Sequence, residues 1–372
     1  MIRNNVPLGR IFGIRIGLDY SWFLIFALLT WILSSNYYPA EFKGWPLALY
    51  WVMGAITSIM LFVSVLLHEL GHSAVALGYG VPVRSITLFI FGGVSQIEAE
   101  PPSATAEFLI AIVGPLVSLA LGILFYALEP VVAFSQPLLG LVKYLAYINL
   151  ALGLFNLIPG YPLDGGRVLR AVVWAITKNM RRATLFAANA GRFFGLGFIF
   201  FGVLQMFSGN FGGGIWIAFI GWFLDSAATT QAQQATLQSL LAGHHVSQAM
   251  RSHCDTVPAE LTLQRLVDEH VLGAGARCFL VNRGDSTVGL MTLHRIKEVP
   301  RQEWSTKTVA QAMVPLDRWK RINPDAELWT ALEEMDRDGV NQLPVMRDGQ
   351  VLGMLGREDV ITFLRTLQEV GT

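Results

Sequence analysis

Six apolar segments of membrane-spanning length constrain the fold of this chain more than any other feature. A helix rises 1.5 Å per residue, so about 20 apolar residues cross the roughly 30 Å of hydrocarbon in a bilayer. In chain order, the segments are 17–35, 48–72, 105–128, 138–160, 185–208 and 212–230. The sequence therefore predicts a multi-pass α-helical membrane protein with about six spans, for which the lipid bilayer is an obligatory partner.

The distribution of charge separates a membrane part from a soluble part. Nine of the 27 acidic residues precede residue 239, and the other 18 fall in the last third of the chain. We therefore expect a membrane domain over 1–238 and a soluble domain over 239–372. The net charge of zero argues against nucleic acid as the principal partner. The two cysteines, Cys254 and Cys278, are too few for a disulfide framework, so a reducing compartment is the simpler interpretation.

Basic residues predict the orientation of the spans, because Lys and Arg accumulate in cytoplasmic loops. Lys43 is the one basic residue of the alternate loops. The opposite side carries Arg3, Arg10, Arg15, Arg84, Arg167, Arg170, Lys178, Arg181 and Arg182. The N-terminus and the soluble domain are then cytoplasmic. No small-residue cleavage site follows the first apolar stretch, which we interpret as a retained span and not a signal peptide.

The second span ends in the motif His68-Glu69-Leu70-Gly71-His72. Residues i and i+4 share one face of a helix, so both histidines can bind one metal ion, with Glu69 beside them as a base toward water. The same pattern recurs by chance in soluble helices whose histidines are unrelated. Ionisable residues inside a span are costly and functional by default, and the other five histidines lie in the soluble domain. The motif therefore predicts a zinc site at membrane depth.

Asp164 is the predicted third zinc ligand, since hydrolytic zinc sites usually have three protein ligands and one open position. In the predicted orientation the second and fourth spans are parallel, so the segment after the fourth span reaches the depth of the histidines. Gly165 and Gly166 follow Asp164 and allow close approach of the backbone. The alternative is that Asp164 caps a helix that begins near Arg167.

Asn156 stands at the end of the fourth span, eight residues before Asp164. Its amide is a neutral donor that could stabilise the oxyanion formed when water attacks a peptide carbonyl. The alternative is that Asn156 belongs to a helix-breaking Asn-x-x-Pro element.

Residues 81–98 follow a pattern of strand, Gly-Gly and strand, and are too short and broken to span the membrane. We expect a small membrane-associated β-hairpin beside the zinc, because irregular backbone is tolerated where it lines a cavity. Such a hairpin could pair with an unwound substrate strand. The alternative is a purely structural hairpin.

Together these motifs resemble the site-2 protease family, zinc metalloproteases that cleave other membrane proteins within or next to a transmembrane helix. The resemblance covers roughly residues 50–170 and rests on the HELGH motif followed by Asn156, Pro159, Leu163, Asp164 and Gly165. It implies a three-helix core at about 48–170, formed by the second, third and fourth spans. It also implies one zinc ion held by His68, His72 and Asp164, Glu69 as general base and acid, and Asn156 as a transition-state stabiliser.

The third span contains Gly114-Pro115, which resembles a Gly-Pro element of the family. Some members have an Asn shortly after this element, whereas this chain has Ser118. No active-site role is therefore assigned to Ser118.

The soluble domain contains an internal repeat. The segment 246–250 returns as 309–313, and 288–291 returns as 352–355, which predicts two copies over 239–303 and 304–372. The repeat resembles a tandem pair of α/β modules of the cystathionine-β-synthase (CBS) type.

The CBS resemblance implies an adenine nucleotide (ATP, ADP or AMP) between the copies, held by a Ser or Thr and an Asp three residues apart. The first copy has Thr292 but Arg295, and the second has Gly356 but Asp359, so each keeps half of the pair. Thr292 and Asp359 are the candidate nucleotide residues. The alternative is a module that forms a homodimer without a ligand.

The predicted function is an intramembrane zinc endopeptidase whose substrate is a single-span or membrane-tethered protein, cleaved toward the cytoplasmic side. The resemblance extends to a bacterial subgroup that includes sporulation sigma-factor processing proteases. It implies a membrane of the bacterial inner-membrane type and an anti-sigma or pro-sigma factor as substrate. The alternative is a CBS-gated metal-ion transporter or channel, because intramembrane His and Asp also line transport pathways. Glu69 discriminates between the endopeptidase and the transporter. Hydrolysis needs a base that does not bind the metal, whereas transport needs only ligands.

Overall fold

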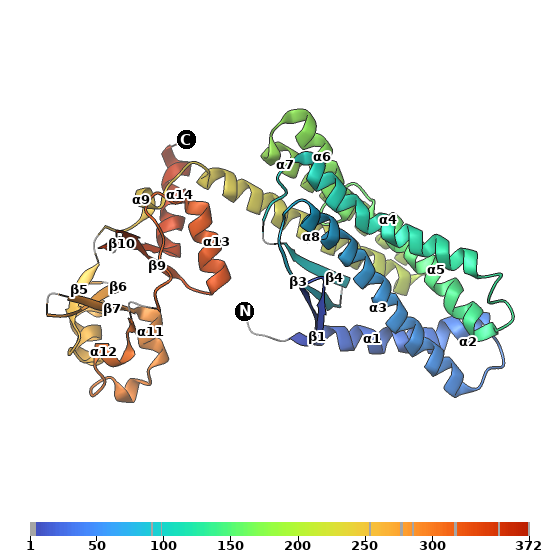
Figure 1. Cartoon of the computed structure of the whole chain (residues 1–372), viewed down its shortest axis with the longest axis horizontal. Helices are drawn as coiled ribbons and strands as arrows, with labels where there is room; N and C mark the ends of the chain where they lie inside the picture. Colours follow the sequence, from blue (N-terminus) through green and yellow to red (C-terminus); the bar gives the residue numbers. More distant parts are fainter. Residues whose placement is uncertain are drawn as a thin grey trace. The chain divides into compact units, whose positions relative to one another are not determined.

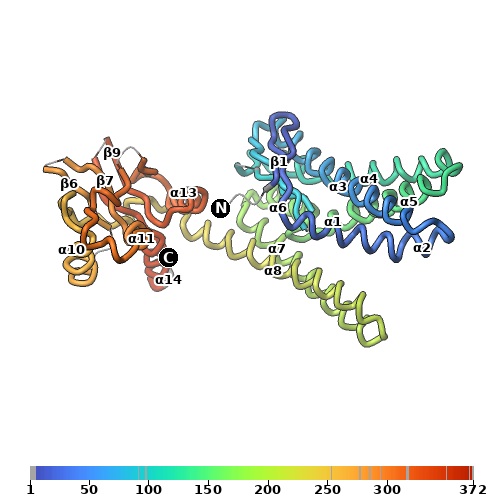
Figure 2. Tube along the Cα trace, turned by 90° about the horizontal axis from the view of Figure 1, so that it is seen from below, coloured from blue at the N-terminus to red at the C-terminus, as the bar shows by residue number. Residues whose placement is uncertain are grey.

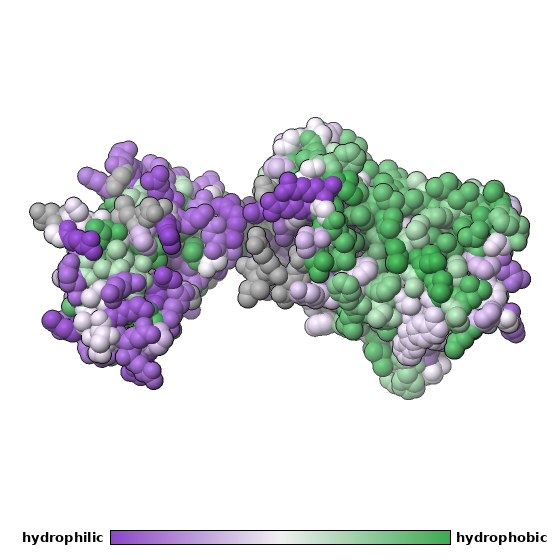
Figure 3. Space-filling model, turned by 60° about the horizontal axis from the view of Figure 1, so that its bottom comes forward, coloured by the Kyte–Doolittle hydropathy of each residue, from purple (hydrophilic) through white to green (hydrophobic). Residues whose placement is uncertain are grey.

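The computed structural model describes residues 5–90, 92–97, 99–252, 254–275, 278–284, 286–315, 318–348 and 350–370. The chain divides into two compact units, 1–236 and 237–372 (Figure 1). Within the described residues, six helices are long and apolar enough to cross a membrane, which confirms the predicted fold class. In the view of Figure 3 the surface of the first unit is mostly hydrophobic, as expected of a surface that faces lipid.

The first span is a continuous helical segment formed by α1 (Tyr20–Ile32), the π-helical turn η1 (Leu33–Tyr37) and α2 (Tyr38–Glu41). The other spans are α3 (Leu47–Gly78), α4 (Ala104–Leu128), α5 (Gln136–Asn156), α7 (Met180–Phe207) and α8 (Phe211–Leu241). A shorter amphipathic helix, α6 (Asp164–Thr177), lies between α5 and α7 in the chain.

Helix α3 is longer than predicted. The apolar pattern continues beyond His72 as far as Gly78, and Gly80, with a φ of +74°, then redirects the chain. The HELGH motif therefore lies inside a helix and not at its end, so that intact helical turns on both sides support the two histidines.

The predicted hairpin is present as β3 (Val83–Phe89) and β4 (Gly92–Ile97), but it belongs to a larger sheet. Strands β1 (Asn5–Ile11) and β2 (Ile14–Asp19) complete four strands in the order β1-β2-β3-β4, with β2 parallel to β3. The N-terminal hairpin was not predicted. Its signal is the alternation of Ile14, Ile16 and Leu18, which are buried.

Helix α4 lies beside α3, α5 and α6 (Figure 2). Glycines allow the close approach of α4 and α5, because Gly122 packs against Leu150 and Gly153 packs against Leu119. The amide of Asn149 in α5 donates a hydrogen bond of 3.2 Å to Ser64 Oγ in α3. These contacts make α3, α4 and α5 one packed bundle that carries the site.

The second unit contains two small sheets. One has the order β5-β6-β7-β8, formed by β5 (Asp255–Pro258), β6 (Cys278–Arg283), β7 (Ser286–Thr292) and β8 (Val314–Pro315); the other pairs β9 (Gln342–Arg347) with β10 (Gln350–Gly356). The helical elements are α9 (Val246–Ala249), α10 (Leu263–Arg265), η2 (Leu266–Leu272), α11 (Leu293–Glu298), η3 (Arg301–Glu303), α12 (Val309–Ala312), α13 (Leu328–Asp338) and α14 (Arg357–Val370).

The two sequence repeats exchange their first short helices. Val246 of α9 is buried in the core formed by α13, β9 and β10, and its N–H donates to Ala326 O at 2.9 Å. Val309 of α12 is buried in the core of the first sheet, and its N–H donates to Leu261 O at 2.8 Å. The limits 239–303 and 304–372 therefore describe the repeat in the sequence and not the two packed cores.

Candidate metal centre and active site

Three predicted ligand residues meet at one point in the membrane unit. Nε2 of His68 lies 3.1 Å from Oδ2 of Asp164, Nε2 of His72 lies 3.2 Å from the same oxygen, and the two Nε2 atoms are 3.1 Å apart. Ligand atoms of a tetrahedral zinc ion with bonds of about 2.0 Å lie about 3.3 Å from one another. The two nitrogens and the carboxylate oxygen therefore form a donor set that fits one zinc ion.

The other ring nitrogens of the histidines are held by α4. Nδ1 of His68 lies 2.9 Å from Ser118 Oγ, and Nδ1 of His72 lies 2.6 Å from Ile110 O. Contacts of this kind orient a metal-binding imidazole and leave Nε2 for the metal. Ser118, to which the sequence analysis assigned no role, thus supports a predicted ligand. Its signal was a hydroxyl in the middle of a very apolar span, where hydroxyls usually bond across helices.

Gly114 of α4 packs directly against both histidines. A Cβ atom at this position would lie 2.7 Å from Nε2 of His68 and still closer to that of His72. Only glycine leaves room for the two imidazoles, which gives the Gly-Pro element a physical reason in this chain.

Asp164 is the first residue of α6, and the N-cap is Leu163, so the helix begins three residues earlier than expected. Within the described residues no side chain caps α6, and the Asp164 carboxylate instead contacts the histidines. Gly165 packs against the carbonyls of Leu157 and Ile158, where a Cβ atom would clash. The geometry therefore favours the ligand over the capping alternative.

The Glu69 side chain lies against β4 and is not part of the donor set. Its Oε2 accepts a hydrogen bond of 2.7 Å from Ser95 Oγ, and Gly93 packs against its side chain. The Ser95 hydroxyl also lies 3.5 Å from that of Ser73. A carboxylate held beside the ligands, but not among them, has the placement that a general base needs. No sequence signal distinguished Ser95, because its role depends on the packing of β4 on α3.

A cavity of about 360 Å³ opens beside the cluster. His68, Glu69, Asn156 and Asp164 all line it. Helix α8 contributes Trp216, Phe219, Ile220, Phe223 and Leu224. This contribution of the last span was not predicted, since an apolar helix that faces a cavity has the same composition as one that faces lipid.

A buried ion pair fastens α6 to α4. The carboxylate of Glu107 is fully buried and pairs with the guanidinium of Arg170, which also lies over the Tyr161 ring at 5.7 Å from its centroid. Arg170 is six residues after Asp164 on the same helix. The pair therefore holds the helix that delivers the third ligand.

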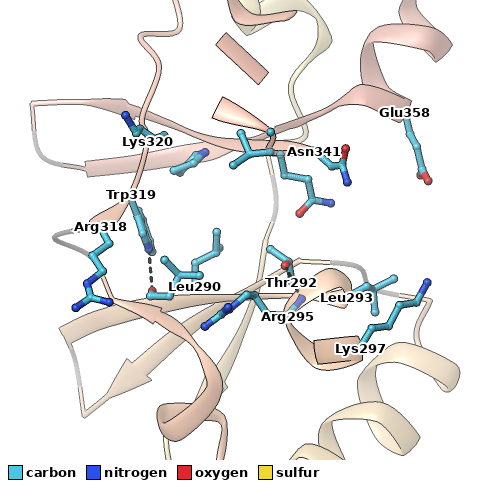
Figure 4. A pocket seen from close by; sticks show the side chains of 15 residues that line it. Leu290, Thr292, Leu293, Arg295, Lys297, Arg318, Trp319, Lys320, Asn341 and Glu358 are labelled. Carbon is cyan, nitrogen blue, oxygen red and sulfur yellow. Dashed lines mark hydrogen bonds between the residues drawn. The ribbon is translucent and has the colours of Figure 1, made fainter. Parts of the chain in front are cut away.

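A second cavity, of about 410 Å³, lies in the 237–372 unit (Figure 4). Thr292 lines this cavity, together with four basic residues, Arg295, Lys297, Arg318 and Lys320, and one acidic residue, Glu358. Asp359 is not among the lining residues. Its carboxylate accepts hydrogen bonds from Arg251 Nε at 2.5 Å and from Gly356 N at 2.8 Å.

The spans and the site define a multi-pass membrane protein with the donor set of a zinc hydrolase. Residues 56–135 and 128–202 match peptidase family M50, and residues 317–366 match the CBS domain. The chain belongs to peptidase family M50, the family of the site-2 proteases, and is a zinc metalloprotease. The metal-ion transporter alternative is set aside.

Relatives named as zinc metalloproteases match nearly the whole chain. Rip3 from Mycobacterium tuberculosis is 36% identical over 96% of this chain and 92% of its own, and sll0528 from Synechocystis is 36% identical over 98% and 97%. Among solved structures, the site-2 protease from Methanocaldococcus jannaschii is 32% identical, with a TM-score of 0.43, over 61% of this chain and 95% of that one.

Proposed function

We propose that this zinc metalloprotease cleaves membrane-anchored proteins within a transmembrane segment and that His68, His72 and Asp164 hold its zinc ion. The observation that carries the proposal is the convergence of these ligands from two helices, with Glu69 beside them, in a unit of six apolar spans. A zinc ion held there would lower the pKa of water to near neutrality and would polarise a peptide carbonyl.

Glu69 and Asn156 complete the proposed chemistry. The Glu69 carboxylate takes a proton from the attacking water and returns it to the leaving amine, while Ser95 keeps it in place. The Asn156 amide lines the same cavity and has no hydrogen-bond partner among the described residues, so it is available to donate to the oxyanion.

The substrate is proposed to bind as an added strand. Strand β4 lies at one edge of the four-stranded sheet, and its Gly93 touches Glu69. An unwound segment that pairs with β4 would pass beside the general base, and its peptide groups would be satisfied by the strand edge at membrane depth.

The proposed substrate class is a single-span or membrane-tethered regulator such as an anti-sigma or pro-sigma factor. A match to stage IV sporulation protein FB from Bacillus subtilis, 33% identical over 30% of this chain, is in line with this class. The basic residues support a cytoplasmic N-terminus and a cytoplasmic CBS unit, with release of the cytoplasmic fragment. Reporter enzymes fused at residue 240 test this orientation. A reporter that is active only in the cytoplasm should be active there.

The cleavage proposal is tested with the protein in liposomes together with a tagged single-span substrate. Glu69→Gln is expected to abolish cleavage and to retain one zinc ion per chain, because this residue acts as a base and not as a ligand. Glu129→Gln, at the far end of α4, is the matched control and is expected to cleave normally. Persistent cleavage by Glu69→Gln would contradict the mechanism.

We further propose that the cavity in the CBS unit binds an adenine nucleotide. Four cationic side chains and the Thr292 hydroxyl provide a setting for phosphates, and the Trp319 ring lies beside them (Figure 4). The contacts of Asp359 with Arg251 and Gly356 place its carboxylate in a structural network, so we assign the phosphate contacts to the basic residues and Thr292.

Calorimetry on the full chain with ATP, ADP and AMP tests this second proposal. We expect binding heat from at least one nucleotide, weakened in Lys320→Ala and unchanged in Lys307→Ala, whose side chain instead pairs with Glu303. Absence of heat with all three nucleotides would refute it. The alternative, a CBS unit that forms a homodimer, would then be tested from the mass of the detergent-solubilised protein.

A further inference from the structure

The two cysteines of the chain lie side by side in the CBS unit. Sγ of Cys254 and Sγ of Cys278 are 3.5 Å apart, and both residues are half-buried. Cys254 directly precedes β5 and Cys278 begins β6. These strands are parallel, with Asp255 opposite Phe279, so the register places the two cysteines opposite each other. Neighbouring strands are about 4.8 Å apart, a Cα separation that a disulfide can bridge.

We propose that Cys254 and Cys278 form a site of reversible oxidation at which a peroxide closes a disulfide. The fold brings together the two cysteines of the sequence, which are 24 residues apart in the chain. Disulfides of cytosolic proteins are usually transient and redox-sensing. In a reducing compartment the two cysteines would therefore be thiols at rest and would form the disulfide only under oxidation.

The two thiols are chemically unequal. The hydrogen bond with Cys278 lowers the pKa of the Cys254 thiol, while the same contact, together with burial, raises the pKa of Cys278. Because the thiolate is the nucleophile, Cys254 is the residue that reacts first.

The reaction balances with hydrogen peroxide as the oxidant. The Cys254 thiolate attacks one peroxide oxygen, the O–O bond breaks, and hydroxide leaves, giving a sulfenic acid. Cys278 then loses its proton, its sulfur attacks the Cys254 sulfur, and a second hydroxide is expelled. The two hydroxides leave as water, so the thiols lose two hydrogens while one peroxide becomes two waters. A small dithiol reverses the step by exchange.

Cys254 lies where the chain passes from one packed core to the other. Three residues earlier, the backbone of Arg251 exchanges hydrogen bonds of 2.8 and 3.0 Å with Met354, and its guanidinium contacts Asp359. Three residues later, Val257 is buried in the core of the first sheet. A disulfide to β6 would therefore fasten the crossing segment, whose Arg251 lies 3.9 Å from Glu358 of the basic cavity.

The test uses the full-length, zinc-loaded protein in detergent, treated with hydrogen peroxide and then digested without reduction. We expect both thiols to disappear together and one peptide pair, Cys254 linked to Cys278 within a single chain, that dithiothreitol separates. Oxidation of one cysteine to a sulfinic acid without a link, links only between chains, or two thiols that stay reactive toward maleimide would each overturn the proposal.

Cys278→Ser is the companion variant. It is expected to give a Cys254 sulfenic acid that a dimedone probe traps, whereas the wild-type protein gives little of this adduct because Cys278 resolves it. Equal trapping in both proteins would overturn the proposal. If the variant fails to fold, the peptide map of the wild-type protein decides by itself.

Discussion

The backbone of Gly114 in α4 packs directly against the imidazole of His72 in α3, with no side chain between them. The same face of α4 provides Ser118 and the Ile110 carbonyl, which hold the outer ring nitrogens of the two histidines. One face of a neighbouring helix therefore determines how both proposed ligands present their Nε2 atoms.

Gly114→Ala is expected to weaken zinc binding by at least about tenfold, because the added methyl group would displace both imidazoles and outer contacts of this kind change affinity by about 10–100-fold. Zinc content per chain after dialysis against a graded chelator measures the effect. Gly197→Ala in α7 is the matched control, since nothing lies within 4 Å of a Cβ atom there. Equal zinc retention in the two variants would contradict the close packing of Gly114 on the ligands.

Ser95→Ala is expected to lower the turnover of a model substrate without loss of zinc. The hydroxyl donates to the Glu69 carboxylate, and hydrogen bonds to charged groups contribute about 1.5–3 kcal/mol, so we expect turnover to fall by about 10–150-fold. Ser95→Thr keeps the donor and suits a strand, so most of the activity should return. Unaltered turnover in Ser95→Ala would show that this hydrogen bond does not position the base.

Arg170→Met is expected to destabilise the membrane unit by about 3–5 kcal/mol, because it leaves the Glu107 carboxylate buried without its counter-charge. Unfolding in detergent measures the loss. In Glu107→Gln/Arg170→Met neither charge remains, so the double variant should lose less than the sum of the single ones. Additive losses would mean that the pair does not couple α4 to α6.

Removal of zinc is expected to abolish proteolysis and to lower the thermal midpoint of the wild-type protein, since a ligand that binds only the folded state stabilises it. The midpoint is measured with and without a chelator, and zinc is then restored. Asp164→Ala should start with little zinc and show almost no shift. A chelator-induced shift of wild-type size in Asp164→Ala would remove this residue from the metal site.

Much of the membrane unit could be predicted from the sequence, because its signals are local. Six apolar segments predicted six spans, and the i, i+4 spacing of His68 and His72 placed both rings on one helix face. Because the second and fourth spans are parallel, the sequence also predicted that Asp164 lies at the depth of the two histidines. The internal repeat of the soluble domain was equally readable, because the segment 246–250 returns as 309–313.

Other features depended on tertiary packing. Whether Ser118 and Ser95 face the site is decided by how α4 and β4 lie against α3, so a hydroxyl in the sequence does not by itself reveal the contact. The lining of the cavity by α8 and the exchange of α9 and α12 between the two cores are likewise contacts between segments far apart in the chain.

The sequence by itself thus determined the class of fold and the candidates for the zinc ligands and the general base, since these depend on hydrophobic period and on residue chemistry. Only the tertiary structure decided which groups orient them and brought Cys254 to Cys278. The reason is physical: side-chain periodicity constrains which face of an element is buried, whereas the partner against which it is buried is selected by close packing over the whole unit.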